Sequence, residues 1–249
     1  SYLYYADRIN ELPLAVIGIA VGTALLPLLS RQIREGNIEA AYNSQNRAIE
    51  LALFLSLPAA AALMVIAEPI ISVMFERGAF DADATAATYP ALMAFAAGLP
   101  AFVLVKILAP GFYANQDTKT PFKIAVVCIG INLAFNLALM IPFQHVGMAM
   151  ATAISGWANV VLMTVVLRKK NWLVLKPHLK VQSAKIITAS ALMVVALVAA
   201  LPYAGGYFEG RELMRFAALI GLSTVGAVVY FLVAYALNIL GMRKKAPSL

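Results

Sequence analysis

The sequence is 249 residues long, 62% hydrophobic and only 12% charged, with a formal net charge of +7. Soluble globular domains are about 45–50% apolar and about 25% charged, so this composition excludes a soluble globular fold. Unbroken apolar runs of about 20 residues exclude a transmembrane β-barrel and indicate an all-α polytopic membrane protein. The basic residues lie at the ends of these runs, so membrane topology explains them better than nucleic-acid binding does. The single cysteine, Cys128, excludes a disulfide framework.

The lengths and flanks of the apolar runs predict seven transmembrane helices. In chain order they cover approximately residues 2–29, 47–75, 86–113, 121–142, 145–168, 184–202 and 213–240. Between the fifth and sixth runs, the basic stretch 171–181 is expected to lie on the membrane surface. The predicted organisation is therefore a core of about five helices (1–168), an amphipathic linker (169–183), and two C-terminal helices with a basic tail (184–249).

The distribution of Lys and Arg predicts the orientation of these helices. Loops on one side hold 14 of the 19 basic residues, namely Arg31, Arg34, Arg47, Lys119, Lys123, Arg168, Lys169, Lys170, Lys176, Lys180, Lys185, Arg243, Lys244 and Lys245. Loops on the other side hold only Arg77, Arg211 and Arg215. Cytoplasmic loops carry the excess of basic residues, so the richer side and the C-terminus are expected to be cytoplasmic.

A cluster of charges stands at the head of the first apolar run. Tyr4, Asp7, Arg8 and Glu11 are three or four residues apart, which places them on one face of a helix. At this spacing Arg8 can contact both Tyr4 and Glu11. Charges at the membrane boundary are costly and usually face a wet cavity or a partner, so one interpretation is an anion site at Arg8. The alternative is a structural ion pair at the outer end of the helix.

A second basic residue interrupts the third apolar run. Lys106 stands in the string LVKIL, near the inner end of its helix, where it either lines a cavity or extends to the headgroups. In the first run, Gly18 and Gly22 form a Gly-x-x-x-Gly spacing that permits close helix contact. We interpret the two glycines as a packing feature.

Two amides face one side of the fourth predicted helix. Asn132 and Asn136 are four residues apart, and Thr152 and Ser155 lie on the next helix. One interpretation is a set of interhelical hydrogen bonds, and the other is an oxygen-lined cation site. The sequence contains no nucleophile elbow, HExxH, Walker loop or glycine-rich dinucleotide turn, so no enzyme chemistry is predicted.

Several strings together resemble one family. They are YYADR at residues 4–8 with ELP at 11–13, GTALLP at 22–27, VKILAPGFY at 105–113, and QDTKTP at 116–121. The chain is similar to the C-terminal half of a MurJ-type lipid II flippase, also called the MviN family, within the exporter superfamily of multidrug, oligosaccharide-lipid and polysaccharide transporters. The family has fourteen helices, so the resemblance implies that this chain carries helices eight to fourteen.

The resemblance implies a function and a set of residues. Members carry the lipid-linked peptidoglycan precursor from the inner to the outer leaflet of the bacterial cytoplasmic membrane by alternating access between two lobes. Arg8 matches a cavity arginine thought to engage the pyrophosphate, Asp7 and Glu11 match acidic positions beside it, and Lys106 matches a cavity-side lysine. Two further helices, here about 184–202 and 213–240, are thought to form a groove for the polyprenyl tail.

The resemblance also bears on cofactors and partners. Some members bind sodium where Asn132, Asn136 and Thr152 lie, although the family pattern has an aspartate in place of Asn136. Beyond this Na⁺ no cofactor is implied. The expected partners are lipid II, membrane lipids and the missing N-terminal lobe, without nucleic acid. The chain opens on Ser1 close to a membrane segment, which we interpret as part of a longer protein.

Three rival interpretations remain at this point. The nearest is a polysaccharide-lipid or drug exporter of the same superfamily, against which the YYADR string argues. A membrane enzyme acting on polyprenyl phosphates would need acids at the cytoplasmic face, whereas Asp7 and Glu11 are predicted toward the outer side. A membrane scaffold without transport activity would leave the cost of Arg8 and Lys106 unexplained.

Overall fold

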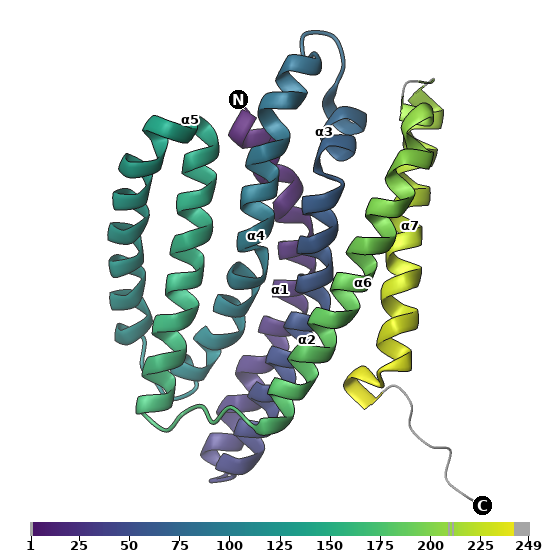
Figure 1. Ribbon diagram of the computed structural model, residues 1–249. Coiled ribbons are helices and arrows are strands. Elements are labelled where there is room, and N and C mark those ends of the chain that lie inside the picture. The colour runs from purple at the N-terminus through teal and green to yellow at the C-terminus, as the bar shows by residue number, and fades with distance from the viewer. Residues whose placement is uncertain (1, 209, 211, 242–249) are drawn as a thin grey trace, which may run out of the picture.

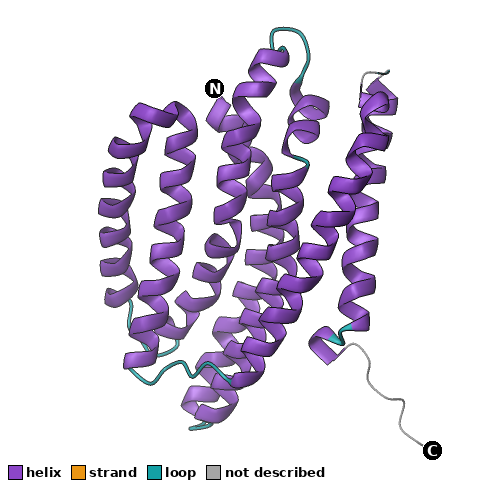
Figure 2. Cartoon of the chain, in the orientation of Figure 1, coloured by secondary structure: helices purple, strands orange, loops and turns teal. Residues whose placement is uncertain are grey.

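The structure is a computed structural model that describes residues 2–208, 210 and 212–241. Within these residues it is all-helical, with the elements α1 (Tyr2–Arg34), α2 (Ile38–Val65), α3 (Ala67–Phe75), α4 (Ala82–Tyr113), α5 (Lys119–Lys169), α6 (Pro177–Phe208), α7 (Glu212–Ala236) and the short 3₁₀-helix η1 (Ile239–Gly241). Six of the helices are long and apolar enough to cross a membrane (Figures 1 and 2).

The helix α5 makes two of the predicted passes. It is 51 residues long, and its backbone leaves the helical region at Gln144, where φ is 50° and ψ is −128°. The two arms fold back side by side (Figure 1). Gly147 makes this turn possible, because a Cβ there would lie 2.2 Å from the carbonyl oxygen of Leu139. Counting both arms, the described residues make the seven passes that the sequence predicts.

The second predicted helix differs from the structure at both ends. The sequence predicts one helix over 47–75, whereas the chain breaks at Ile66 into α2 and α3. The reason is Pro69, which has no N–H to donate to the carbonyl of Val65 and whose ring crowds that carbonyl. The start moves to Ile38 because the side chain of Asn37 caps the helix by accepting a hydrogen bond from the N–H of Ala40.

The central helix is α4. In the most apolar stretch of α4, 67% of the residues are buried, compared with 11% in the corresponding stretch of α5. The difference arises because α1, α2 and α5 all pack around α4. The pair α6 and α7 lies to one side and packs against α2 (Figure 1). The helix α6 begins at Pro177, so residues 177–183, which we expected in the linker, form its first turns.

The loops divide between two ends of the bundle. Residues 35–37, 114–118 and 170–176 lie at one end, together with the basic helix termini around Arg34, Lys119 and Lys169 (Figure 1). We call this the basic end. The turn at Gln144 and the loop after α3 lie at the other end. Of the basic residues in the orientation prediction, Arg211, Arg243, Lys244 and Lys245 lie outside the described residues, as does the rest of the predicted basic tail.

Candidate functional site

The first three turns of α1 present an exposed polar face. The guanidinium of Arg8 donates from Nη1 to Oε2 of Glu11 over 3.1 Å, and the two side chains are 66% and 51% exposed. Asp7 and Tyr4 are exposed on the same face, where Tyr4 packs edge-on against the ring of Tyr5. The expected contact between Arg8 and Glu11 therefore forms, while the ring of Tyr4 contacts its neighbour in the chain.

The opposite side of the same turns is buried. Ala6, Ile9 and Asn10 are 0%, 7% and 1% exposed, and the two apolar residues belong to a cluster with Ile71 of α3 and Leu92 of α4. The helix α1 is thus anchored through one side only. Its charged face is left without cover from the other described helices, which is the condition for a residue such as Arg8 to meet a ligand or another lobe.

Lys106 reaches this helix from α4. Its side chain lies across Gly18, where a Cβ would come within 2.6 Å of Cδ and 3.5 Å of Nζ. Its backbone oxygen lies beside Gly22, 3.3 Å from where a Cβ would stand. Lys106 is exposed, and the part of the chain that the structure describes provides no hydrogen-bond or ion-pair partner for its ammonium. Gly22 therefore allows the close helix contact that the spacing predicts, while Gly18 lies against the lysine side chain.

Helix geometry places these two cations on one face of α1. Gly18 follows Glu11 by seven residues, which is nearly two full turns of an α-helix. Gly18 therefore lies within about 20° of the direction of Glu11 and about 10 Å further along the axis. The ammonium of Lys106 lies near Gly18 and the guanidinium of Arg8 lies at Glu11. The structure thus places Lys106, which is distant from Arg8 and Glu11 in the sequence, about 10 Å along α1 from their ion pair, and all three side chains are exposed.

The predicted sodium ligands also come together, between the two arms of α5. Nδ2 of Asn136 donates to Oδ1 of Asn132 over 2.8 Å, and Nδ2 of Asn132 approaches the hydroxyl of Thr152 at 3.5 Å. That hydroxyl donates to the carbonyl of Met148, and Oδ1 of Asn136 is buried without a partner. A hard cation binds several oxygen ligands at once. Of the three side-chain oxygens here, those of Asn132 and Thr152 already accept hydrogen bonds from amide N–H groups.

Ser155 extends this ladder by donating to the carbonyl of Cys128 over 2.8 Å. Among the described residues no group of three or more His, Cys, Asp or Glu side chains is placed to hold a metal ion. The arrangement matches the interhelical hydrogen bonds of the alternative interpretation, and the sodium site stays a prediction.

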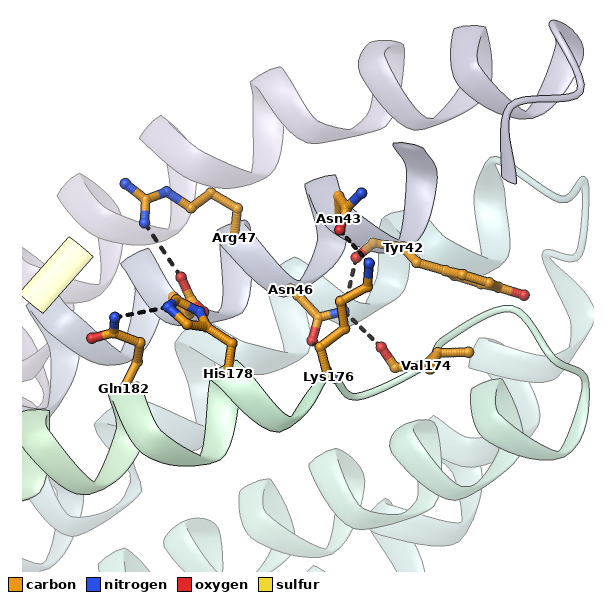
Figure 3. Close-up of polar contacts among 9 residues, drawn as sticks. Tyr42, Asn43, Asn46, Arg47, Val174, Lys176, His178 and Gln182 are labelled. Carbon is orange, nitrogen blue, oxygen red and sulfur yellow. Dashed lines mark hydrogen bonds and ion pairs between the residues drawn. The ribbon is translucent and has the colours of Figure 1, made fainter. Parts of the chain in front are cut away.

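A polar network at the basic end was missed by sequence reasoning. Glu50 of α2, whose side chain is only 5% exposed, binds Nδ1 of His178 over 2.8 Å and Nη1 of Arg47 over 3.3 Å. His178 also contacts Gln182 one turn further along α6, as Figure 3 shows. The sequence patterns single out neither Glu50 nor His178 as a candidate site residue. The partners are 128 residues apart, so no local pattern signals the contact.

The same end ties the linker to α2 and α5. Asn46 bonds to the backbone of Val174 and Lys176 (Figure 3). Asp117 accepts hydrogen bonds from the ammonium of Lys170 over 2.5 Å and from the hydroxyl of Thr120 over 2.6 Å. The hydrogen bond from Lys170, followed by those from Thr120, holds the pKa of Asp117 well below its usual range. Asp117 also accepts a hydrogen bond from the N–H of Thr120 in the first turn of α5, so this part of the QDTKTP string joins the start of α5 to the linker.

The pair α6 and α7 encloses an apolar cavity against α2. Its volume is about 230 Å³, and its lining includes Phe54, Pro58, Met193, Leu197, Gly226 and Tyr230. The hydroxyl of Tyr230 donates to the carbonyl of Phe54 over 2.6 Å, so the polar group is satisfied inside an apolar wall. At the end of the pair away from the basic end, Arg215 holds α7 to α3 by donating from Nη2 to the hydroxyl of Ser72 over 2.6 Å.

Comparison with known proteins decides the family. The family model described as lipid II flippase MurJ matches residues 1–218. This chain belongs to the MurJ lipid II flippase family. The resemblance carried by the YYADR and VKILAPGFY strings is thereby confirmed.

Individual MurJ relatives agree along nearly the whole chain. A probable lipid II flippase MurJ from Rhizobium tropici is 42% identical over 95% of this chain and 45% of its own length. A second, from Rickettsia prowazekii, is 39% identical over 96% of this chain and 47% of its own length. A solved structure of the lipid II flippase MurJ in an inward closed conformation superimposes with a TM-score of 0.78 at 25% identity, covering 98% of this chain and 48% of that one.

These comparisons also show how much of a MurJ protein this chain covers and to which class of protein it belongs. It spans about half the length of the curated relatives that it matches. The MurJ family consists of transporters, and with its apolar spans the chain is a multi-pass membrane protein. The predicted fold, an all-helical part of a MurJ-type flippase, is confirmed by the structural neighbour.

Proposed function

We propose that this chain is the C-terminal half of a flippase that carries lipid II from the inner to the outer leaflet of the bacterial cytoplasmic membrane. The observation that supports this most is the exposed charged surface formed by Arg8 and Glu11 of α1 and Lys106 of α4, in an otherwise apolar chain. Charges on a membrane helix are tolerated where they meet water, a ligand or another lobe. The half-length coverage of the MurJ relatives leaves room for an N-terminal lobe opposite this face.

In this proposal Arg8 binds the pyrophosphate of lipid II. A guanidinium offers five N–H donors in a planar fork that matches phosphate oxygens. Glu11 takes one of these donors and holds the side chain along the helix face, which leaves the rest of the fork for an anion. Asp7 and Tyr4 complete the polar face, and Lys106 supplies a second positive charge.

The polyprenyl tail is proposed to lie against α6 and α7. The cavity between these helices and α2 is lined by aliphatic and aromatic side chains, which suits an isoprenoid chain. Hydrogen bonds and ion pairs at both ends of the pair keep it against α2 and α3, so the groove stays next to the lobe that binds the headgroup.

Alternating access is the proposed mechanism. A MurJ relative with the same fold has been solved in an inward closed conformation, which fits a cycle in which the cavity closes toward one side and opens toward the other. In our orientation the basic end and the C-terminus are cytoplasmic. No observation favours the polysaccharide-lipid or drug exporter, since the family model and the relatives are lipid II flippases.

Complementation of a flippase-depleted bacterium tests this proposal. The chain, joined to an N-terminal flippase half, is compared with Arg8→Ala, Arg8→Lys and the control Arg34→Ala, which removes a basic residue from the other end of α1. We expect wild type and the control to restore growth and both Arg8 variants to fail, with all four inserted at equal levels. Rescue by Arg8→Lys but not by Arg8→Ala would mean that a positive charge at this position is sufficient for flipping. Full rescue by Arg8→Ala would overturn the assignment of Arg8.

A further inference from the structure

We propose that Gly18 is a positioning residue for Lys106. In this inference, which rests on the proposed function, the absence of a side chain at Gly18 lets the lysine stem lie along α1. The ammonium is thereby directed toward Arg8, so that both cations engage the same lipid-linked diphosphate.

The direction of the lysine side chain follows from its two glycine contacts. Its backbone oxygen and Cβ lie beside Gly22, at 3.3 Å and 4.0 Å from the position of a Cβ there. Its Cδ, Cε and Nζ lie beside Gly18, one turn nearer the N-terminus of α1, at 2.6, 3.5 and 3.5 Å. The stem therefore runs from Gly22 toward Gly18, which is the direction of Arg8.

The two glycines have different neighbours. A Cβ at Gly22 would press on backbone, which is the close helix contact that a Gly-x-x-x-Gly spacing usually provides. At Gly18 the three atoms nearest to a Cβ would all belong to the side chain of Lys106. Gly18 is within a regular helix and has no positive φ to require glycine. Glycine in a helix interior is destabilising, and the contact with the lysine stem supplies a structural reason for a glycine at this position.

The separation of the two cations suits a small bridging anion. Between Glu11, which holds the guanidinium of Arg8, and Gly18, where the ammonium lies, the axial rise is about 10 Å. Charge-assisted hydrogen bonds of about 2.8 Å at either side take up part of this distance. The remainder leaves room for a diphosphate, and the unpartnered ammonium of Lys106 has donors for it.

A double-mutant cycle on the joined flippase tests this inference. Binding of undecaprenyl diphosphate to the detergent-solubilised protein is measured for Gly18→Ala, Lys106→Ala, the double variant, and the control Gly130→Ala, which meets nothing within 4 Å. We expect Gly18→Ala to weaken binding about tenfold, as the loss of one hydrogen bond to a charged group does. The double variant should bind no more weakly than Lys106→Ala alone, because without the lysine stem the added methyl group displaces nothing.

The outcomes separate the inference from the proposed function. If Gly18→Ala binds normally while Lys106→Ala is weakened, Lys106 contributes to the site and the positioning role of Gly18 is wrong. If Gly18→Ala weakens binding equally with and without Lys106, its effect is on helix packing and the inference is again wrong. If Lys106→Ala binds like wild type, the lysine has no part in the site. The proposed contact of Lys106 with the diphosphate and the positioning role of Gly18 are then both wrong, whereas the role of Arg8 is untouched. Melting temperatures of all variants, measured without ligand, report any general loss of structure.

Discussion

Replacing Asn46 with alanine should loosen the linker from the core. Asn46 is 5% exposed, and its side chain donates to the carbonyl of Val174 over 2.7 Å and accepts from the N–H of Lys176 over 3.0 Å (Figure 3). It also donates to the carbonyl of Tyr42 in its own helix. Alanine removes all three bonds and leaves two linker groups without their protein partners.

The magnitude follows from the two linker bonds. Each is worth about 1 kcal/mol net, and a buried group left without a partner costs about 1–3 kcal/mol. The linker lies at the end of the bundle, where water reaches part of it, so we expect a loss of about 2 kcal/mol in the free energy of unfolding. For a domain of about 150–250 residues, each kcal/mol lowers the melting temperature by about 2–4 °C, which gives a shift of about 4–8 °C.

Thermal unfolding in detergent measures this shift, with Asn43→Ala as the matched control. Asn43 is an exposed neighbour on α2 whose side chain accepts one hydrogen bond, from the ammonium of Lys176. Its loss should cost no more than about 0.5 kcal/mol, as for other exposed polar contacts. The reasoning is refuted if Asn46→Ala melts within error of Asn43→Ala.

Two further predictions concern the loop after α4 and the turn in α5. Because the pKa of Asp117 is lowered in the folded protein, its contribution to stability is complete above the unfolded pKa of about 3.9 and is lost as the pH falls below that value. The stability difference between wild type and Asp117→Asn should therefore be constant from about pH 8 to 5 and narrow below about pH 4, and a difference that widens in acid would contradict this. Gly147→Ala should cost at least about 2 kcal/mol and lower the membrane yield, because its Cβ would strike the backbone of Leu139, whereas Gly130→Ala has open space and should be tolerated. Equal yields and melting temperatures for these two alanine variants would show that the turn relaxes around the methyl group.

The sequence by itself determined the features that depend on neighbours along the chain. The number of passes follows from apolar runs long enough to span a bilayer, and the turn between the arms of α5 lies where the predicted runs meet. The spacing of Arg8 and Glu11 was enough to predict their contact, because residues three apart on a helix are neighbours whatever the tertiary fold. The string resemblance gave the family, which the comparisons confirm.

Tertiary structure decided which distant residues meet. Glu50 and His178 are 128 residues apart, and nothing in either segment specifies the other. The contact of the Lys106 side chain with Gly18 likewise depends on how α4 crosses α1. Most of the surface of a membrane helix is apolar on all sides, so the hydrophobic pattern does not select its partners, and close packing and hydrogen bonds select them instead. These short-range contacts form only once the helices are assembled, which is why the sequence predicted the helices and the charged face but not the contacts that hold them in place.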